Sequence, residues 1–367
     1  MDDIRITESI CTIQYCIDKG ARVILCSHLG RPKSKADTKY TIKPVVDRLQ
    51  SYLKDTKVTF IDDSIGTKVE NAVAKLKDGE ILYLENIRFY SEEAKNDETF
   101  ARNLSNLCDY YVNDAFGTAH RAHASTEGIA KFVPAVAGFL MEREIKTLTE
   151  VIKNPKRPLT IILAGAKLAD KISTLDNLLK IADNMLIAGG MAYTFVKAQG
   201  GNIGNSIVDD SLLNYCLGVI KQAKRTGVNL VVSIDTVAGD SYSPDANSRI
   251  FDCDKIRDGW EGFDIGPKTI EAFKEVINKS GTIVWCGSLS IEFEKFSQGA
   301  KQVIYAIAES SAITITGGGN TARDLIQYGI ADKFTHISTG GGATLEFLEG
   351  KQLPGIAALY EMGRNIK

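Results

Sequence analysis

The sequence lacks the cysteine and histidine spacings that mark a zinc site or a disulfide framework. Its seven cysteines are scattered without a CxxC pair, and none of its four histidines lies at ligand spacing to them. Cys11, Cys16, Cys26 and Cys216 fall within apolar patterns typical of helices or strands. We therefore expect buried free thiols in a reducing compartment rather than disulfides.

Long apolar runs and a large excess of one charge are also absent. No apolar run approaches the roughly 20 residues of a membrane helix, and the first residues show no signal-peptide pattern. Lys and Arg total 44 against 46 Asp and Glu, so the net charge of −2 offers no global basic field to nucleic acid. We expect no membrane and no nucleic-acid partner. The G-x-G-x-x-G fingerprint of a nicotinamide-dependent dehydrogenase is missing as well.

The chain does have the length and composition of two globular domains, with 367 residues, 44% of them hydrophobic and 25% charged. In the first half, short apolar runs alternate with helical patterns, which predicts a parallel sheet with helices on both faces. The first helix should have Thr7 as its N-cap and end at Gly20. The expected strands cover residues 21–26, 57–61, 81–84 and 110–112, and the expected helices cover residues 7–19, 44–53, 69–76 and 100–107.

A long polar helix at 139–152, broken by Asn154-Pro-Lys-Arg-Pro158, marks the best domain boundary. The second half repeats the strand–helix order, with expected strands at 159–163, 184–188, 230–234, 283–285, 313–316 and 334–338. The predicted fold class is α/β, with two doubly wound, Rossmann-like parallel-sheet domains. The predicted limits are a first domain at 1–138, a linker helix acting as a hinge at 139–154, a second domain at 155–350 and a tail at 351–367.

Basic side chains follow three of the expected strands in the first half. They are His28, Arg31, Arg88, His120 and Arg121. Because ligands of open α/β sheets bind beyond the carboxyl ends of the strands, we expect these groups to share one rim. Several cations on one rim suit a small phosphorylated or carboxylated anion. The alternative is that each arginine is merely solvated.

Glycines follow most of the expected strands in the second half, so a flat ring and a polyphosphate could approach the backbone. Lys167 and Lys171 add point charges for phosphates, although an exposed helix face is the alternative. Gly317-Gly-Gly-Asn-Thr321 joins a strand to a helix. A helix start offers free N–H groups and about half a positive charge to an anion. This stretch by itself is equally consistent with a phosphate-binding site and with a simple glycine turn.

Longer motifs resemble those of the phosphoglycerate kinase family along essentially the whole chain. They are Cys26-Ser-His-Leu-Gly-Arg-Pro-Lys33, Leu84-Glu-Asn-Ile-Arg-Phe89, Val112-Asn-Asp-Ala-Phe-Gly-Thr-Ala-His-Arg-Ala-His123, Gly165-Ala-Lys167 with Asp170-Lys-Ile172, Gly189-Gly-Met-Ala192, Phe263-Asp-Ile-Gly-Pro-Lys-Thr269 and Ser338-Thr-Gly-Gly-Gly-Ala343. The resemblance implies two facing domains, one binding 3-phosphoglycerate and the other binding Mg²⁺ with ATP or ADP.

The resemblance also implies roles for individual residues. The acid substrate would be bound by Arg5, His28, Leu29, Gly30, Arg31, Arg88 and Arg121. The nucleotide would be bound by Gly165, Ala166, Lys167, Lys171, Gly189, Gly190, Gly266, Glu292, Gly318, Gly319, Asn320 and Thr321. Catalysis would rest on Arg5, Lys167, Gly318 and Gly319, with Arg5 stabilising the phosphoryl group in transit. The implied protein is a cytoplasmic, monomeric enzyme of glycolysis.

Three features depart from the family pattern. The family carries an Arg-Val-Asp-Phe-Asn-Val-Pro strand before the first helix, which is missing here. Asn320 stands where the family has the aspartate that binds Mg²⁺, and an amide oxygen is a weaker ligand. The loop Trp285-Cys-Gly-Ser-Leu-Ser-Ile-Glu292 is one residue shorter than the family's loop, with Cys286 in place of an amide. These departures favour a second hypothesis, a catalytically impaired relative that binds a ligand or partner without turnover.

Overall fold

The structure is a computed structural model that describes residues 3–365, with residues 319, 320 and 361–365 described for the backbone alone. Its contacts divide the chain into two compact units, Met1–Lys146 with Gln352–Lys367 and Thr147–Lys351. The chain passes from the first unit to the second within α6 (Phe139–Lys153). The segment expected as a tail contains a helix, α14 (Pro354–Asn365), that belongs to the first unit. The predicted domain limits themselves stay a prediction.

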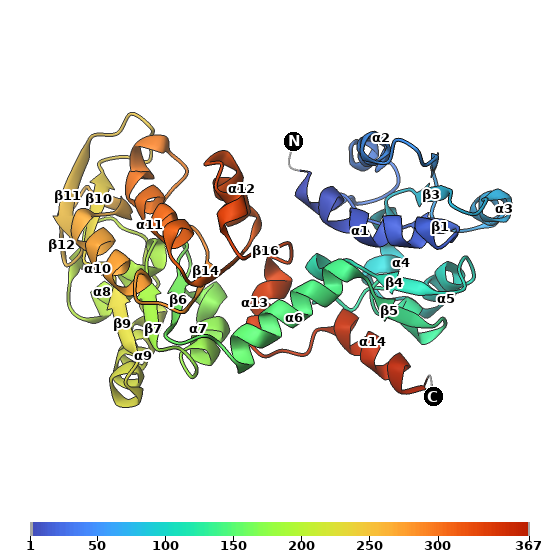
Figure 1. Cartoon of the computed structure of the whole chain (residues 1–367). Coiled ribbons are helices and arrows are strands. Elements are labelled where there is room, and N and C mark those ends of the chain that lie inside the picture. Colours follow the sequence, from blue (N-terminus) through green and yellow to red (C-terminus); the bar gives the residue numbers. More distant parts are fainter. Residues whose placement is uncertain (1–2, 366–367) are drawn as a thin grey trace. The chain divides into compact units, whose positions relative to one another are not determined.

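The first unit contains two small parallel sheets (Figure 1). One has the order β1-β3-β2 and the other pairs β4 with β5. Their strands are β1 (Val23–Leu25), β2 (Val58–Ile61), β3 (Ile81–Leu84), β4 (Tyr111–Asn113) and β5 (Ala135–Ala137). Its further helices are α1 (Ile4–Asp18), α2 (Lys43–Tyr52), α3 (Thr67–Lys75), α4 (Ser91–Ala94) and α5 (Glu98–Ser105). Within the described residues, β1 and β4 each have a strand partner on one side only.

The start of α1 differs from the sequence prediction. The helix begins at Ile4 with Asp3 as its N-cap, and Thr7 lies inside it. The Thr7 hydroxyl donates to the carbonyl oxygens of Asp3 at 3.3 Å and Ile4 at 3.1 Å. The prediction of Thr7 as N-cap was therefore wrong, because this hydroxyl bonds back to an earlier turn instead of accepting from a free N–H. Gly20, with φ +75°, follows the helix as expected.

The second unit is built on a six-stranded parallel sheet of order β16-β15-β14-β6-β7-β9. The strands are β6 (Leu159–Leu163), β7 (Asn184–Ile187), β9 (Asn229–Val232), β14 (Thr282–Cys286), β15 (Ile313–Gly317) and β16 (His336–Ser338). The helices are α7 (Ile172–Leu178), α8 (Gly190–Ala198), α9 (Leu213–Thr226), α10 (Pro267–Ile277), α11 (Gln298–Glu309), α12 (Gly319–Gln327) and α13 (Gly342–Leu348). Every residue of β6 and β14 is buried, as expected of central strands covered on both faces.

A smaller antiparallel sheet in the second unit escaped the sequence prediction. It has the order β11-β10-β13 and consists of β10 (Asp235–Gly239), β11 (Ser248–Asp252) and β13 (Glu261–Ile265). A further parallel pair joins β8 (Asn202–Ile203) to β12 (Lys255–Ile256). The connection from β10 to β11 runs from Asp240 to Asn247, which is longer than the two-residue turns that identify a hairpin in a sequence.

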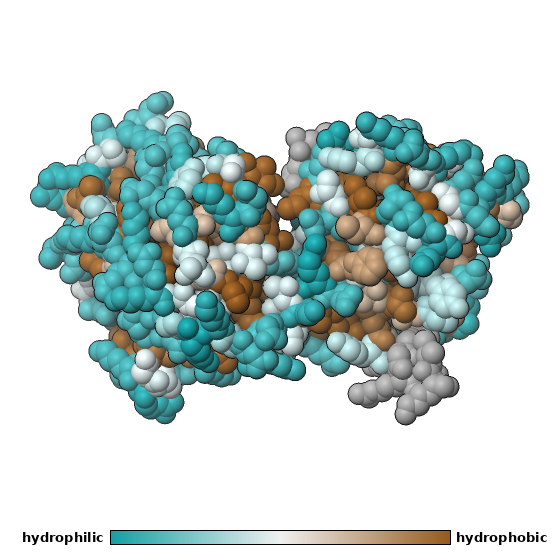
Figure 2. Space-filling model, in the orientation of Figure 1, coloured by the Kyte–Doolittle hydropathy of each residue, from teal (hydrophilic) through white to brown (hydrophobic). Residues whose placement is uncertain are grey.

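All seven cysteines are free thiols, but their burial departs from expectation. Cys216, Cys253 and Cys286 are buried, whereas Cys11 and Cys26 are exposed. Thr12 and Ile13, not Cys11, are the buried residues of α1, and Cys26 follows the edge strand β1, so an apolar pattern did not place either thiol in a core. Charged and polar side chains cover much of the visible surface of each unit (Figure 2). No helix in the described part is long and apolar enough to cross a membrane.

Candidate functional site

In the first unit, the loop after β1 is held in place by residues that follow β3. Asn86 Nδ2 donates to the carbonyl oxygens of Leu29 and Tyr40, both at 2.8 Å. Gly30 has φ +61°, and a side chain there would collide with the Tyr40 ring. The Gly30 carbonyl accepts a hydrogen bond from Arg88 Nη1 at 2.9 Å. The structure thus brings the predicted residues Leu29, Gly30 and Arg88 together.

Arg88 keeps hydrogen-bonding capacity that the described protein does not use. Its Nη2 atom is buried and has no partner there. Burial, followed by the nearby charges of Arg121 and Arg31, lowers the pKa of Arg88. A guanidinium stays charged at neutral pH. An unmet donor among like charges is stabilised by a bound anion.

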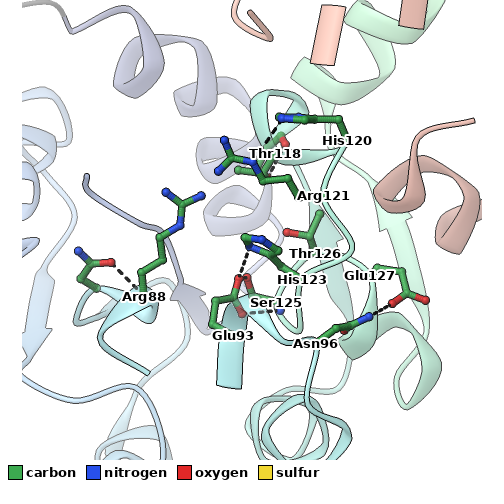
Figure 3. A network of polar contacts seen from close by, with 12 residues as sticks. Arg88, Glu93, Asn96, Thr118, His120, Arg121, His123, Ser125, Thr126 and Glu127 are labelled. Carbon is green, nitrogen blue, oxygen red and sulfur yellow. Dashed lines mark hydrogen bonds and ion pairs between the residues drawn. The ribbon is translucent and has the colours of Figure 1, made fainter. Parts of the chain in front are cut away.

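The loop after β4 is fixed by a network around Glu93 (Figure 3). This buried carboxylate accepts hydrogen bonds from the Ser125 N–H at 2.9 Å and the Ser125 hydroxyl at 2.7 Å. His123 Nδ1 lies 3.4 Å from Glu93 Oε1. The network links α4 to the segment that follows Arg121. In Figure 3, the guanidinium groups of Arg121 and Arg88 lie on the same side of it.

His28 lies within the influence of several cationic side chains. Burial, and then Arg88, Arg121 and Arg5, lower its pKa to about 3. Coulomb effects fall with distance, so these groups share one electrostatic environment. We call Arg5, His28, Arg31, Arg88 and Arg121 the basic cluster. No described ion pair involves any of its four arginines.

In the second unit, the strand order reverses between β6 and β14. The chain proceeds from β6 outward through β7 to β9, and later from β14 outward through β15 to β16. A parallel α/β sheet leaves a crevice outside the carboxyl ends of its strands at such a reversal. The glycine loops that follow β6, β7 and β14 therefore stand at the position where this architecture binds ligands.

Three of these loops touch one another through their backbones. Gly165, Gly189 and Gly287 all have positive φ, at +123°, +68° and +95°. A side chain on Gly189 would begin 2.8 Å from the Gly165 nitrogen and 2.9 Å from the Ser288 oxygen. A side chain on Gly287 would collide with the Ala164 carbonyl. Glycine is needed at all three positions for the backbone conformation, and at Gly189 and Gly287 it is needed for space as well.

The predicted lysines and the remaining loop residues adjoin these glycines. Lys171 Nζ lies 3.2 Å from the point where a Gly165 side chain would begin. Gly190, at the start of α8, approaches Ala166 so closely that a side chain on it would begin 2.9 Å from the Ala166 oxygen. Lys167 is exposed on the same loop. Neither lysine forms an ion pair with a described residue, so both charges can meet a phosphate.

The stretch after β15 forms the start of α12. Gly318 has φ +120° and is the N-cap, and the Thr321 hydroxyl bonds back to its carbonyl oxygen at 2.9 Å. Thr321 is buried. The first N–H groups of a helix have no partner within the helix, so the start of α12 can offer them to an anion. Gly319 and Asn320 lie in this turn, but the surroundings of both, including the predicted metal ligand, fall outside the described residues.

A family model, similar sequences and solved structures all indicate the same protein family. The phosphoglycerate kinase family model matches residues 1–351. The chain belongs to the phosphoglycerate kinase family. It is 49% identical to phosphoglycerate kinase 3, cytosolic, of Arabidopsis thaliana over 365 residues, covering 98% of this chain and 90% of the relative. It is 47% identical to the Clostridium tetani phosphoglycerate kinase over 364 residues, with 98% and 90% covered.

Solved structures of phosphoglycerate kinases confirm the predicted fold class. The enzyme from Coxiella burnetii has a TM-score of 0.87 at 36% identity, covering 98% of this chain and 92% of that one. The enzyme from Pyrococcus horikoshii has a TM-score of 0.86 at 32% identity, covering 100% and 93%. Family membership makes the chain a kinase, which transfers phosphoryl groups.

Two residues assigned through the family resemblance have neighbours that the sequence did not predict. Gly266 precedes α10, and a side chain on it would begin 2.5 Å from the carboxyl carbon of buried Asp235. Its closest neighbours are thus atoms of Asp235, not of the other glycine loops. Glu292 accepts hydrogen bonds from the hydroxyl of Tyr242.

Several residues that position the site were missed. Asn86 holds the loop after β1, Glu93 holds the loop after β4, and Asp235 accepts from the N–H groups of Lys268 at 3.0 Å and Thr269 at 2.8 Å at the start of α10. Glu93 and Asp235 are buried carboxylates, yet in the sequence each resembles an ordinary surface acid. Asn86 stood within a family motif, which was the one available signal.

Proposed function

We propose that the chain catalyses the reversible transfer of a phosphoryl group between 1,3-bisphosphoglycerate and ADP, giving 3-phosphoglycerate and ATP in glycolysis. The acceptor in the reverse direction is the carboxyl group of 3-phosphoglycerate. The observation that carries this proposal is the basic cluster, whose arginines form no ion pair among the described residues. A substrate with a carboxylate and a phosphate supplies the missing negative charge.

We assign the acid substrate to residues 1–138 and the nucleotide to residues 155–350. In the first region, the basic cluster with Leu29 and Gly30 binds 3-phosphoglycerate. In the second, the loops at Gly165–Ala166, Gly189–Gly190 and Gly266 and the side chain of Glu292 bind the base and ribose. Lys167, Lys171 and the start of α12 at Gly318–Thr321 bind the phosphates, since helix N–H groups and lysine charges both favour anions.

The chemistry requires position and positive charge rather than a base. The attacking carboxylate is already ionised at neutral pH. Arg5 stabilises the phosphoryl group in transit, a contribution on the order of 10³–10⁵ in rate for arginines in other phosphoryl-transfer enzymes. The other proposed catalytic residues are Lys167, Gly318 and Gly319. The charge of Lys167 and the backbone N–H groups of the two glycines would face the transferred phosphoryl group.

Magnesium is proposed as a companion of the nucleotide. It would supply positive charge to the phosphate oxygens. Asn320 is the side chain that we assign to it, and its amide oxygen is a possible but weaker ligand than a carboxylate for this cation. No group of three or more His, Cys, Asp or Glu side chains in the described residues could hold a metal by itself. This donor set fits an ion held mainly by phosphates and water.

We further propose a cytoplasmic monomer. The free thiols agree with a reducing compartment. One relative carries the word cytosolic in its name. Each compact unit buries its own hydrophobic clusters, so neither needs a second copy to complete a core.

A coupled assay of the purified chain tests the function. We expect ADP to be formed from ATP only when 3-phosphoglycerate and Mg²⁺ are present. Arg5→Ala should lower kcat by about 10³ or more while leaving the affinity for ATP unchanged. Normal ATP binding with no turnover would contradict the proposal and favour the impaired relative.

A further inference from the structure

The loop that carries Glu292 is anchored at both ends but not at Glu292 itself. At its start, the Trp285 indole N–H donates to the Gly287 carbonyl at 2.8 Å. Near its end, the Ile291 N–H donates to the Phe263 carbonyl at 3.0 Å. Glu292 is exposed. An exposed glutamate loses much rotamer freedom when it is fixed on a ligand, which weakens binding.

Tyr242 supplies the missing restraint from a separate loop, between β10 and β11. Its hydroxyl lies 2.9 Å from Oε1 and 2.8 Å from Oε2 of Glu292. In the described part of the chain, no other donor reaches this carboxylate. A hydroxyl has one proton to donate, so it contacts both oxygens while leaving most of their lone pairs available.

The tyrosine ring is itself held in place. It packs edge-on against Phe263, with ring centroids 5.7 Å apart, and its centroid lies 5.1 Å from that of Phe293. The loop beneath it is closed by Asp240, which accepts hydrogen bonds from the Asn247 N–H at 3.0 Å and Asn247 Nδ2 at 2.7 Å. The packing of the ring therefore fixes the position of the Tyr242 hydroxyl.

We propose that Tyr242 is a positioning residue that presents the Glu292 carboxylate to the ribose hydroxyls of the bound nucleotide. This inference rests on the proposed function, which assigns Glu292 to the ribose. A carboxylate accepts hydrogen bonds only, so it suits the 2′- and 3′-hydroxyl donors. Tyr242 thereby contributes to the preference for nucleotides that carry both hydroxyls.

Equilibrium binding without turnover provides the test. The affinities of ADP and 2′,3′-dideoxy-ADP are measured by calorimetry for the wild type and for Tyr242→Phe. We expect the wild type to prefer ADP by about 10-fold or more, because a hydrogen bond to a charged group is lost with the analogue. Tyr242→Phe should reduce this preference several-fold and leave the affinity for the dideoxy analogue unchanged.

Two further variants sharpen the test. Tyr52→Phe removes another exposed tyrosine–carboxylate hydrogen bond, to Asp3 at 3.0 Å, in the first unit. It should not change the preference. In a Glu292→Ala background, Tyr242→Phe should have no further effect on the preference, because its role acts through Glu292.

The hydrogen bond can also be detected without nucleotide. It is the largest cause of the raised pKa of the Tyr242 phenol. Glu292→Ala should return that pKa toward its ordinary value in an ultraviolet titration.

The results distinguish the positioning role of Tyr242 from the existence of the nucleotide site. An unchanged ADP preference in Tyr242→Phe would overturn the positioning role. Equal losses for ADP and the analogue would also overturn it, because they indicate a packing role. Failure of the wild type to bind either nucleotide would instead refute the nucleotide site itself.

Discussion

Arg88 uses one end of its guanidinium for the protein, and the other end has no partner among the described residues. Nη1 holds the Gly30 carbonyl, while Nη2 is buried. A lysine would carry the same charge on a single nitrogen, which cannot occupy the positions of both Nη1 and Nη2. We expect Arg88→Lys to raise KM for 3-phosphoglycerate by about 10- to 100-fold, the effect of losing a charged hydrogen bond.

The matched control for Arg88→Lys is Arg102→Lys. Arg102 lies in the same unit but is exposed and pairs with Glu98 one turn away, at 3.1 Å. Steady-state kinetics should show no change in this variant, and the KM for ATP should stay constant in both. A similar rise in both KM values for Arg88→Lys would indicate general damage rather than a lost substrate contact.

His28 makes the free energy of unfolding depend on pH. Its pKa is about 3 in the folded chain against 6.5 for an ordinary histidine. Between these values, the unfolded chain holds a proton that the folded chain does not, so stability increases as pH rises through this window. We expect the wild type to lose about 1–2 kcal/mol more than His28→Gln between pH 7 and pH 5. Urea unfolding at the two pH values measures this difference.

The pKa of His28 should also respond to a bound anion. Because Arg88, Arg121 and Arg5 depress the pKa of His28, a bound anion should offset part of their effect and raise it. An NMR titration of His28 with and without 3-phosphoglycerate should show the upward shift. An unchanged titration would argue against the binding of the acid beside His28.

Among the helices and strands, the sequence predicted best those elements that are set by residues adjacent in the chain. The strands at Ile81–Leu84 and Leu159–Leu163 were predicted with their observed limits because each is a continuous apolar run. The antiparallel sheet of β10, β11 and β13 was missed, because its long connections give no local turn signal. The Tyr242–Glu292 contact joins residues 50 positions apart, which no local pattern could reveal.

The start of α12 should respond to a single added charge. Asn320 is the proposed metal ligand, and an aspartate there would offer Mg²⁺ a charged oxygen. We expect Asn320→Asp to lower the Mg²⁺ concentration needed for half-maximal turnover by about 10-fold, the effect of strengthening one ligand contact by about 1.4 kcal/mol. Asn202→Asp adds the same charge at an exposed position in β8 and should have no effect. Equal Mg²⁺ dependence in all three proteins would show that the amide suffices.

The two small sheets of the first unit should be less stable than the sheet of the second. β4 has a single partner, β5, and a two-stranded sheet is marginal by itself. β14 has partners on both sides and is buried throughout. Native-state hydrogen exchange should therefore show faster exchange in β4 and β5 than in β6 and β14. Equal protection of β4 and β14 would mean that packing compensates for the missing pairing.

On the scale of the whole molecule, the first unit depends on the end of the chain. The Gly355 N–H in α14 donates to the Ala119 carbonyl at 2.9 Å. A side chain on Gly355 would begin 2.8 Å from Thr126 Cγ2 and 3.0 Å from the Ala119 Cα. We expect Gly355→Ala to lower the stability of the first unit by about 1–3 kcal/mol, the usual cost of overpacking.

Gly218→Ala is the control for this variant. Gly218 also lies in a helix, α9 of the second unit, and a side chain there would meet nothing within 4 Å. Replacing an unstrained helical glycine should stabilise by up to about 1 kcal/mol. Thermal unfolding of both variants makes the comparison. A gain in stability for Gly355→Ala would show that α14 is free to shift.

The return of α14 to the first unit has a consequence for synthesis on the ribosome. Residues 147–351 form one continuous stretch, so the second unit is complete before α14 has been made. The first unit emerges earlier but lacks α14, which packs Ala358 against Ala130 and Ala135. Since domains tend to fold as their residues emerge, the unit that is translated first should be the last to finish. A nascent chain that stalls before α14 would display an unfinished first unit together with a finished second unit.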